Sequence, residues 1–318
     1  MDVRPADLRE PDPDVIGALA DGEVGRQRGE LQADEAAARE QRRQRRYLMH
    51  ALLRSPTFMT GLIIVLFWVF MALFSTSLTQ SPTAQDAFAS LQAPSAAHWF
   101  GTDDLGRDVL TRMLFAGRIS LLLALVVTAL SVAIGTFLGA LAGFFGGWAD
   151  RLVSLATDSL LSLPVLGLAM VAGSVLRPNL WTLAVVLALV SWPTLSRITR
   201  AQMLTLRERT YAEAARALGL RPQRVLFRHL LPNAVAPLIV AATLLSAQVL
   251  LVESALSFLG YGMRPPTPSW GGMLNEAQAF YRQSPWLAVF PGLMITLTVA
   301  SLNFVGDALR TAMGGRGG

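Results

Sequence analysis

Residues 119–145 read ISLLLALVVTALSVAIGTFLGALAGFF, a run of apolar and small residues without a charged side chain. A helix needs about 20 apolar residues to cross the hydrocarbon core of a bilayer, and this run exceeds that length. Further apolar stretches of similar or shorter length lie on both sides of it, at about 58–77, 152–176, 180–196, 233–259 and 286–307. The sequence therefore predicts an all-α membrane protein with six transmembrane helices.

Several of the predicted spans contain a proline, which removes a backbone N–H and clashes with the preceding turn of a helix. Pro164 lies in the third stretch, Pro193 in the fourth and Pro291 in the sixth. We expect local kinks at these positions, because neighbouring groups in a membrane bundle can satisfy the freed carbonyls.

The second stretch carries Gly135, Gly139 and Gly143 at intervals of four residues. Glycines at this spacing form a small-residue face that lets a second helix approach closely. We predict a helix-packing role for all three, either against another helix of this chain or against another subunit.

The composition excludes several function classes. Of the 318 residues, 53% are hydrophobic and 15% are charged, against about 25% charged in an ordinary soluble domain. Cysteine is absent, which excludes disulfides and thiolate metal sites, and we predict no metal site. All 27 basic residues are arginine, so the chain has neither the lysine of a phosphate-binding P-loop nor a Schiff-base lysine. We predict a non-catalytic chain that does not itself hydrolyse ATP and does not bind nucleic acid.

Arginines are distributed unevenly over the segments between the predicted spans. With the N-terminus inside, the N-terminal tail, the 146–151 turn, the 197–231 loop and the C-terminal end hold 21 of the 27 arginines. The other six lie on the opposite side, in about 78–118, 177–179 and 260–285. Because positive residues concentrate in cytoplasmic loops, the sequence predicts that both termini and the 197–231 loop are cytoplasmic.

Residues 1–57 are predicted to form a cytoplasmic tail outside the membrane. The first 30 are rich in Asp, Glu, Pro and Gly, which is typical of disorder. Residues 32–54 look helical and contain a cluster of arginines at 42–46 that suits contact with anionic lipid headgroups, docking of a partner protein being the alternative. A transmembrane domain is predicted for residues 58–310 and a short flexible tail for 311–318.

Three acidic residues, Asp158, Glu253 and Asp307, lie within or at the ends of predicted spans. Each is within about two turns of a predicted end, where a carboxylate can reach water or headgroups. We therefore favour structural capping over a functional role, although an acid in a membrane span is a functional candidate by default. A coupled carrier would place such groups nearer the midplane, at broken helices.

Residues 213–232, EAARALGLRPQRVLFRHLLP, separate the fourth and fifth predicted spans. Gly219 is placed to end one short helix, Pro222 to begin a second, and Pro232 to open the next apolar run. A helix–turn–helix on the positive side of the membrane suits the docking of a cytoplasmic partner.

Two further segments lie on the predicted outer side. Residues 98–112 read HWFGTDDLGRDVLTR, in which Gly101, Thr102 or Asp103 is expected to cap a helix. Residues 257–271 read SFLGYGMRPPTPSWG, and their prolines predict a stiff, extended path.

Aromatic residues accompany both outer segments. We expect Trp99, Tyr261 and Trp270 to be exposed. Such residues suit a protein interface, or equally the aromatic belt at the membrane–water boundary.

These segments resemble the signatures of one family. Glu213-Ala214-Ala215, followed by Gly219 and Leu231-Pro232, resembles the "EAA…G…LP" loop of ABC importer permeases. Residues 98–112 and 257–271 resemble the "H…GTD…GRDVLSR" and "SFLG.G..PP.PSWG" signatures of the C-type permeases of dipeptide and oligopeptide importers, although Trp99 and Phe100 replace the usual pair. His229 fits the Arg-His-Ile/Leu-Leu-Pro-Asn of the peptide branch. The resemblance covers about residues 50–310.

The resemblance implies the type I permease fold of ABC importers and a place in the bacterial cytoplasmic membrane. It also implies a heterodimer with a homologous B-type permease, two cytoplasmic ATPase subunits and an extracytoplasmic substrate-binding protein. ATP and Mg would be bound by the partner ATPases, and this chain would bind no cofactor. The implied mechanism is alternating access driven by the ATPases.

The resemblance also implies roles for individual residues. Glu213 would anchor the loop at the ATPase surface, Ala214, Ala215 and Gly219 would keep its helix slim, and three arginines would form salt bridges there or a solvated face. The ATPase-coupling residues are then Glu213, Ala214, Ala215, Arg216, Gly219, Arg224, Arg228, Leu231 and Pro232. The residues in loops that face the binding protein are Gly101, Thr102, Asp103, Gly106, Arg107, Asp108, Pro265, Pro266 and Trp270.

Alternatives remain open within and outside this family. Nickel chelates and haem are transported by permeases with the same pattern as those for peptides. A secondary carrier without ATPase subunits is a candidate of a different class, disfavoured by the lack of charges near the midplane. A membrane scaffold is a third possibility, which the pattern of spans alone does not exclude.

Overall fold

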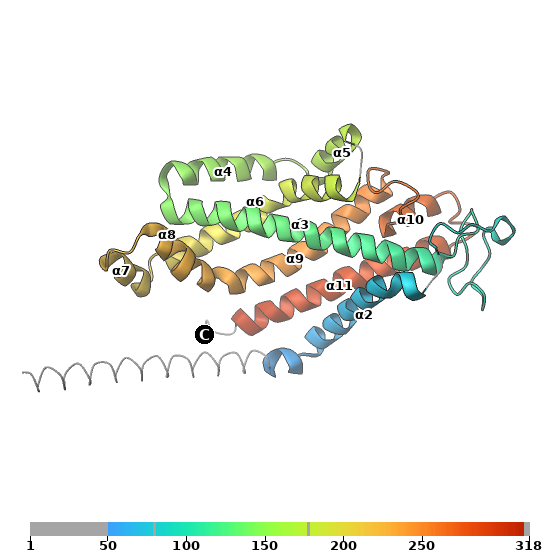
Figure 1. Cartoon of the computed structure of the whole chain (residues 1–318), viewed down its shortest axis with the longest axis horizontal. Coiled ribbons are helices and arrows are strands. Elements are labelled where there is room, and N and C mark those ends of the chain that lie inside the picture. The colour runs from blue at the N-terminus through green and yellow to red at the C-terminus, as the bar shows by residue number, and fades with distance from the viewer. Residues whose placement is uncertain (1–49, 79–80, 177–178, 315–318) are drawn as a thin grey trace, which may run out of the picture. The chain divides into compact units, whose positions relative to one another are not determined.

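The computed structural model describes residues 50–78, 81–176 and 179–314, so the features predicted for residues 1–49 and 315–318 lie outside the described residues. The chain divides into two compact units, Met1–Arg54 and Ser55–Gly318. The second unit contains the elements shown in Figure 1: α2 (Pro56–Leu78), η1 (Ala87–Ala89), α3 (Val109–Phe145), α4 (Gly147–Leu161), α5 (Val165–Val175), α6 (Leu180–Leu206), α7 (Thr210–Ala217), α8 (Pro222–Arg224), the π-helical η2 (Val225–Leu230), α9 (Leu231–Phe258), α10 (Trp270–Ala277) and α11 (Trp286–Gly314).

The regular secondary structure in the described part of the second unit is helical, apart from an isolated bridge between Thr102 and Asp108. Helices α2, α3, α6 and α11, and the continuous helical segment Pro222–Phe258, are each long and apolar enough to cross a membrane. The third predicted span is divided into α4 and α5, which pass the same test as a pair bent by 84°. The unit therefore has five candidate spans, or six if this pair counts as one.

The bend predicted at Pro164 is confirmed, and it is larger than the local kink that was expected. Pro164 is the residue before α5 and has an extended backbone, so the helix stops completely and restarts in a new direction. Pro193 and Pro291 lie inside α6 and α11, and neither interrupts its helix. A proline breaks a helix when its surroundings cannot accommodate the lost hydrogen bond, and the sequence alone does not show those surroundings.

Two helices are about ten residues longer than predicted: α3 begins earlier in the sequence, and α6 ends later. Helix α3 begins at Val109, because the Asp108 carboxylate caps it by accepting from the Thr111 N–H at 2.7 Å. The expectation that Gly101, Thr102 or Asp103 caps this helix is therefore wrong. Helix α6 continues to Leu206, since the arginines that end its apolar pattern are good helix formers.

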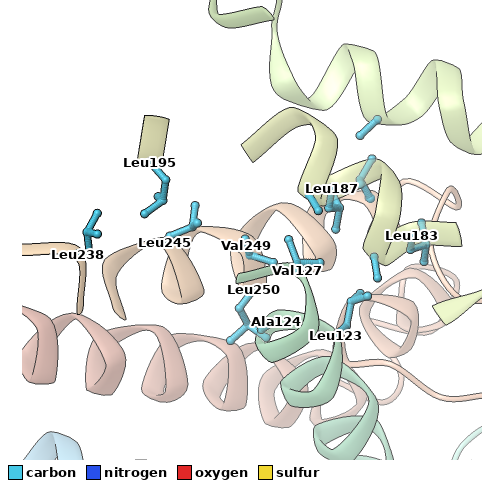
Figure 2. Close-up of a cluster of buried hydrophobic side chains, with 14 of the residues drawn as sticks. Leu123, Ala124, Val127, Leu183, Leu187, Leu195, Leu238, Leu245, Val249 and Leu250 are labelled. Carbon is cyan, nitrogen blue, oxygen red and sulfur yellow. The ribbon is translucent and has the colours of Figure 1, made fainter. Parts of the chain in front are cut away.

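The core of the unit lies between α3, α6 and α9. Figure 2 shows leucine, valine and alanine side chains from these three helices converging on one another, and all are buried: Leu123, Ala124, Val127, Leu183, Leu187, Leu195, Leu238, Leu245, Val249 and Leu250. Helix α11 packs against α9 and α2. We call the end of the unit that holds α7 and the Gly146 turn the α7 end, and the end that holds α10 and residues 81–108 the α10 end (Figure 1).

The glycine face of α3 packs against α6 of the same chain. A Cβ atom on Gly139 would lie 2.3 Å from the carbonyl oxygen of Ser196. Similar additions at Gly135 and Gly143 would lie 2.7 Å from the Trp192 oxygen and 2.6 Å from the Arg200 oxygen. The two backbones therefore touch along about two turns, and the contact within the chain is the one that these glycines make.

Replacing Gly139 with alanine should destabilise the protein. The new methyl group must push a backbone carbonyl aside, and overpacking of this kind costs about 1–3 kcal/mol. Thermal unfolding of the purified protein in detergent, followed by tryptophan fluorescence, measures the effect.

The matched control is Gly292→Ala in α11, where an added Cβ meets no atom within 4 Å. This variant should be neutral or slightly stabilising, because alanine is the better helix former by about 1 kcal/mol. Equal melting temperatures for the two variants would contradict the close contact between α3 and α6.

Candidate functional site

The segment between α6 and α9 is built around a left-handed glycine. Gly219 has φ +74°, its N–H donates to the Arg216 carbonyl, and the Leu220 N–H donates to the Ala215 carbonyl. This pair of bonds closes the last turn of α7 and reverses the chain. Pro222 then starts a helix that continues through the π-helical η2 into α9 without a break, so Pro232 lies inside a helix.

Helix α7 presents one face to its own chain and one to the outside. Ala212 and Ala215 are buried in the cluster that includes Val225 and Leu226 of η2. Glu213 and Ala214 are exposed. The small size of Ala215 therefore serves packing within this chain, and Ala214 is the alanine that an external partner can reach.

Two arginines tie this segment to the membrane helices. The Arg216 guanidinium donates to the carbonyl oxygens of Ala212 and Arg207, the latter at the end of α6. Arg207 in turn donates to the Gly143 carbonyl of α3 at 3.3 Å. Arg216 is thus engaged inside the chain, whereas Arg224 and Arg228 are exposed and make no ion pair within the described residues.

The outward face of this segment mixes apolar and charged groups. Leu218 is 81% exposed, and Tyr211 and Phe227 are nearly half exposed. Leu218 directly follows the last residue of α7, so its side chain is open to a partner protein at the end of that helix. Sequence reasoning did not single out Leu218, although its position beside Gly219 in a short turn was the available signal.

The α10 end is held by a cluster of ion pairs. The Asp103 carboxylate accepts from Arg107 Nε and from Arg112 Nη1, both at 2.6 Å. Glu276 of α10 accepts from Arg107 Nη2 at 3.2 Å and pairs with Arg112 Nη2 at 2.9 Å. The four side chains join residues 81–108, α3 and α10, and the two arginines and Asp103 are almost completely buried.

Several residues predicted to face a binding protein are internal parts of this end. Thr102, Asp103, Arg107 and Trp270 are buried, and the Trp270 indole donates to the Met113 carbonyl at 3.0 Å. The expectation that Trp270 is exposed is therefore wrong, because its ring lies between α3 and α2 against Gly117 and Trp68.

Other predicted residues of the α10 end do reach the surface. Pro265 and Pro266 are exposed, Trp99 is 70% exposed and Tyr261 is half-buried. Gly101 and Gly106 have positive φ angles and lie against backbone or Trp286, and Asp108 caps α3 and contacts His98 Nδ1 at 3.0 Å. Phe88, which the sequence did not single out, is 97% exposed.

Glu253 does not reach water or headgroups, and the capping role predicted for it is wrong. It lies in α9 near the α10 end and is 2% exposed. Its carboxylate accepts hydrogen bonds from Ser120 of α3 at 3.1 Å and from Ser257 of α9 at 2.8 Å. Neutral hydroxyl donors satisfy it, so it joins α3 to α9 rather than ending a helix.

The other two acids of the predicted spans differ from each other. Asp158 of α4 pairs with Arg197 of α6 at 2.6 Å, which the capping expectation did not foresee. A second pair, Asp150 with Arg200, joins the same two helices nearer the α7 end. Asp307 is exposed on α11, seven residues before its end.

Replacing Arg112 with leucine should destabilise the α10 end. The change leaves the buried Asp103 without one of its two arginine partners, and breaking a buried ion pair from one side costs about 3–5 kcal/mol. The same fluorescence melt in detergent measures the loss. Arg264→Leu is the control, since Arg264 is exposed and its replacement should change stability by about 0.5 kcal/mol or less. An unchanged melting temperature for the Arg112 variant would show that the cluster carries no stability.

Comparison with known proteins gives two family matches. The model of the binding-protein-dependent transport system inner membrane component matches residues 135–316. The model of the N-terminal transmembrane domain of oligopeptide transport permease C matches residues 44–94.

Individual relatives agree with these matches. A dipeptide transport system permease protein of Alkalihalophilus pseudofirmus is 40% identical over 254 residues, 80% of this chain and 84% of the relative. A putative peptide permease protein of Brucella suis is 46% identical over 237 residues, 74% and 78% of the two chains. A probable D,D-dipeptide transport system permease protein of Escherichia coli is 36% identical over 291 residues, 90% and 98% of the two chains.

Proposed function

The chain belongs to the family of binding-protein-dependent transport system inner membrane components, and we propose from this premise how its two ends share the work of peptide import. It is a transmembrane permease subunit of an ABC peptide importer and a multi-pass protein of the inner membrane. We further propose that the chain has the type I permease fold, with the bent pair α4–α5 as the sixth span and both termini in the cytoplasm.

We place the α7 end in the cytoplasm, where the exposed face of α7 docks on an ATPase subunit. The observation that carries this assignment is Leu218, a leucine 81% exposed at the tip of a short helix whose other face is buried in its own chain. An exposed leucine at the end of a helix that also exposes the Glu213 carboxylate suits a groove on a partner protein. The arginine asymmetry of the sequence supports the cytoplasmic side.

The contacts of α7 explain how docking would move the membrane helices. Arg216 joins α7 to the end of α6, Arg207 joins that end to α3, and η2 continues directly into α9. A displacement of α7 is therefore passed to all three helices of the core. The segment Pro222–Phe258 has 37 residues and is about 55 Å long, so it spans the membrane from α7 to the α10 end.

The remaining partners follow from the same assignment. A homologous permease completes the translocation path, two ATPases bind and hydrolyse ATP with Mg, and an extracytoplasmic binding protein delivers peptide to the α10 end. This chain contributes the path and the coupling and binds no cofactor. The exposed residues Phe88, Trp99, Pro265 and Pro266 are the candidates for contact with the binding protein, and the buried Trp270 supports them from within.

Replacing Glu213 with arginine should uncouple ATP hydrolysis from transport. The side chain is exposed on the docking face, so charge reversal opposes a fit to the ATPase without disturbing the fold. We expect peptide uptake by the reconstituted complex to fall at least tenfold while the amount of inserted protein is unchanged.

The control reverses a charge just outside α7, at Glu208→Arg, where the side chain is also exposed. This variant should retain most of the uptake. Wild-type uptake by the Glu213 variant would remove the coupling role from α7.

Labelling of single cysteines tests the orientation, because the chain has no native cysteine. Asp104→Cys lies at the α10 end and Gln223→Cys at the α7 end, and both side chains are exposed. A membrane-impermeant maleimide applied to intact cells, with any outer membrane permeabilised, should modify the first and spare the second. The reverse pattern would place α7 outside the cell and end the docking proposal.

A further inference from the structure

The ion pair between Asp158 and Arg197 is exposed, in contrast to the other charged pairs of the core. The Arg197 Nη2 and Asp158 Oδ1 atoms are 2.6 Å apart, yet the side chains are 55% and 63% exposed. Neither group makes another hydrogen bond or ion pair within the described residues, and Asp158 also interacts electrostatically with Arg200 of the neighbouring pair. One carboxylate oxygen and most of the guanidinium N–H groups are therefore available to a further partner.

The pair lies along the candidate spans α6 and α4–α5, in the half nearer the α7 end, although the arginine count of the sequence assigned Arg197 to the cytoplasmic 197–231 loop. Arg197 directly follows Ser196, whose carbonyl touches Gly139, six residues inside the end of α3 at Phe145. It is also nine residues before the end of α6 at Leu206, which corresponds to about 14 Å along the helix. Charged side chains at such a position do not face lipid but a protein surface or a water-filled path.

The helix break beside the pair supports the same reading. Helix α4 ends at Leu161, three residues after Asp158, and the chain bends by 84° before α5 begins. Ser162 and Pro164 in this break are exposed, as are Ser159 of α4 and Thr194 of α6. Irregular backbone at membrane depth is tolerated where it is covered by protein or lines a cavity. A face that combines a broken helix, hydroxyl groups and two charges is therefore suited to a polar path or to contact with another protein.

A second ion pair, between Asp150 and Arg200, also joins α4 to α6. Asp150 accepts from both Nε and Nη2 of Arg200, a two-bond contact that is only about a third exposed. Asp158 and Arg197 share a single bond. A single, exposed, self-neutralising pair is suited to exchanging its partners, since opening it leaves each charge free for an incoming charge of opposite sign.

We propose that Asp158 and Arg197 form a substrate site on the translocation path that binds the charged termini of a free peptide. The Asp158 carboxylate takes the terminal ammonium, and the planar Arg197 guanidinium takes the terminal carboxylate through two hydrogen bonds. The exposed Ser159 and Thr194 hydroxyls, within three residues of the pair in α4 and α6, can bond to the peptide amides. When the path is empty, the two side chains neutralise each other. The proposal rests on the role of the chain as a peptide permease.

The test uses the complete reconstituted importer and peptides blocked at one end. Purified binding protein is first used to select a free peptide, an N-acetylated peptide and a C-amidated peptide that it binds, and uptake is then measured with each at saturating loaded binding protein. The variants are Asp158→Asn and Arg197→Gln, which keep size and hydrogen-bonding ability. Assembly with the partner subunits and ATPase activity are measured for each variant, so that failure of docking is distinguished from failure of this site.

We expect the loss of uptake to depend on the terminus that each residue binds. Arg197→Gln should slow the free and N-acetylated peptides about tenfold, which corresponds to one charged contact of about 1.4 kcal/mol, and should leave the C-amidated peptide within twofold of wild type. Asp158→Asn should slow the free and C-amidated peptides and spare the N-acetylated one.

A double charge reversal separates substrate contact from a structural pair. Asp158→Arg with Arg197→Asp restores an ion pair with reversed polarity and should not restore uptake of the free peptide. Asp150→Arg with Arg200→Asp reverses the neighbouring pair, which also acts electrostatically on Asp158, and should retain most of the wild-type uptake. Full rescue by the first reversal would make the pair structural and overturn the proposal. Equal slowing of all three peptides by the single variants would assign the pair to contact with another subunit and would also overturn the proposal.

If the neutral variants fail to assemble, Arg197→Lys keeps the charge and removes only the two-bond geometry. Unchanged discrimination between carboxylate and amide ends in that variant would count against the site.

Discussion

The hydrocarbon core of the bilayer offers no hydrogen bonds and does not solvate charge, and the rest of the structure follows from this constraint. Backbone groups in such a medium must be satisfied within the segment that carries them, so the described spans are long helices. Where a helix does break, at Pro164, the exposed backbone is accompanied by serine hydroxyls and a charged pair. Because the bilayer interior does not solvate charge, each acidic side chain in the core needs hydrogen-bond donors or a cation from the protein. Glu253 is enclosed by serine hydroxyls, and Asp150 is held by both arms of Arg200.

Close contact between helix backbones holds the helices together, because the hydrophobic effect does little to associate helices within lipid. Apolar side chains gain little by leaving lipid for protein, so helices associate through van der Waals packing and polar contacts. The glycine face of α3 brings its backbone against α6, and Arg207 and Arg216 connect the ends of these helices to α7. Helix α9 carries the same connection to the α10 end, where the buried ion cluster and Trp270 hold the loop residues together. One stiff assembly thus joins the surface proposed to meet the ATPase to the surface proposed to meet the binding protein.

The candidate site was partly predictable from local patterns. Gly219 and Pro222 lie where helix-ending and helix-starting residues are expected, since both effects depend on one residue's own backbone. The direction of each side chain was not predictable in the same way. Ala215 faces inward and Ala214 outward because η2 packs on one side of α7. Trp270 is buried and Glu276 reaches Arg112 because α10 folds back on α3, a contact between residues about 160 positions apart.

The sequence by itself determined the class of the protein, the number of apolar stretches and the family, because hydrocarbon thickness acts on each stretch separately and the motifs are local strings. Tertiary structure alone decided that the third stretch is two helices bent by 84° rather than one continuous helix, that the glycines of α3 meet α6, and that Glu253 is enclosed while Asp158 is exposed beside Arg197. These outcomes depend on which helices are neighbours. The free energy of a buried or paired charge is a property of its surroundings, and those surroundings come from segments that are distant in the sequence.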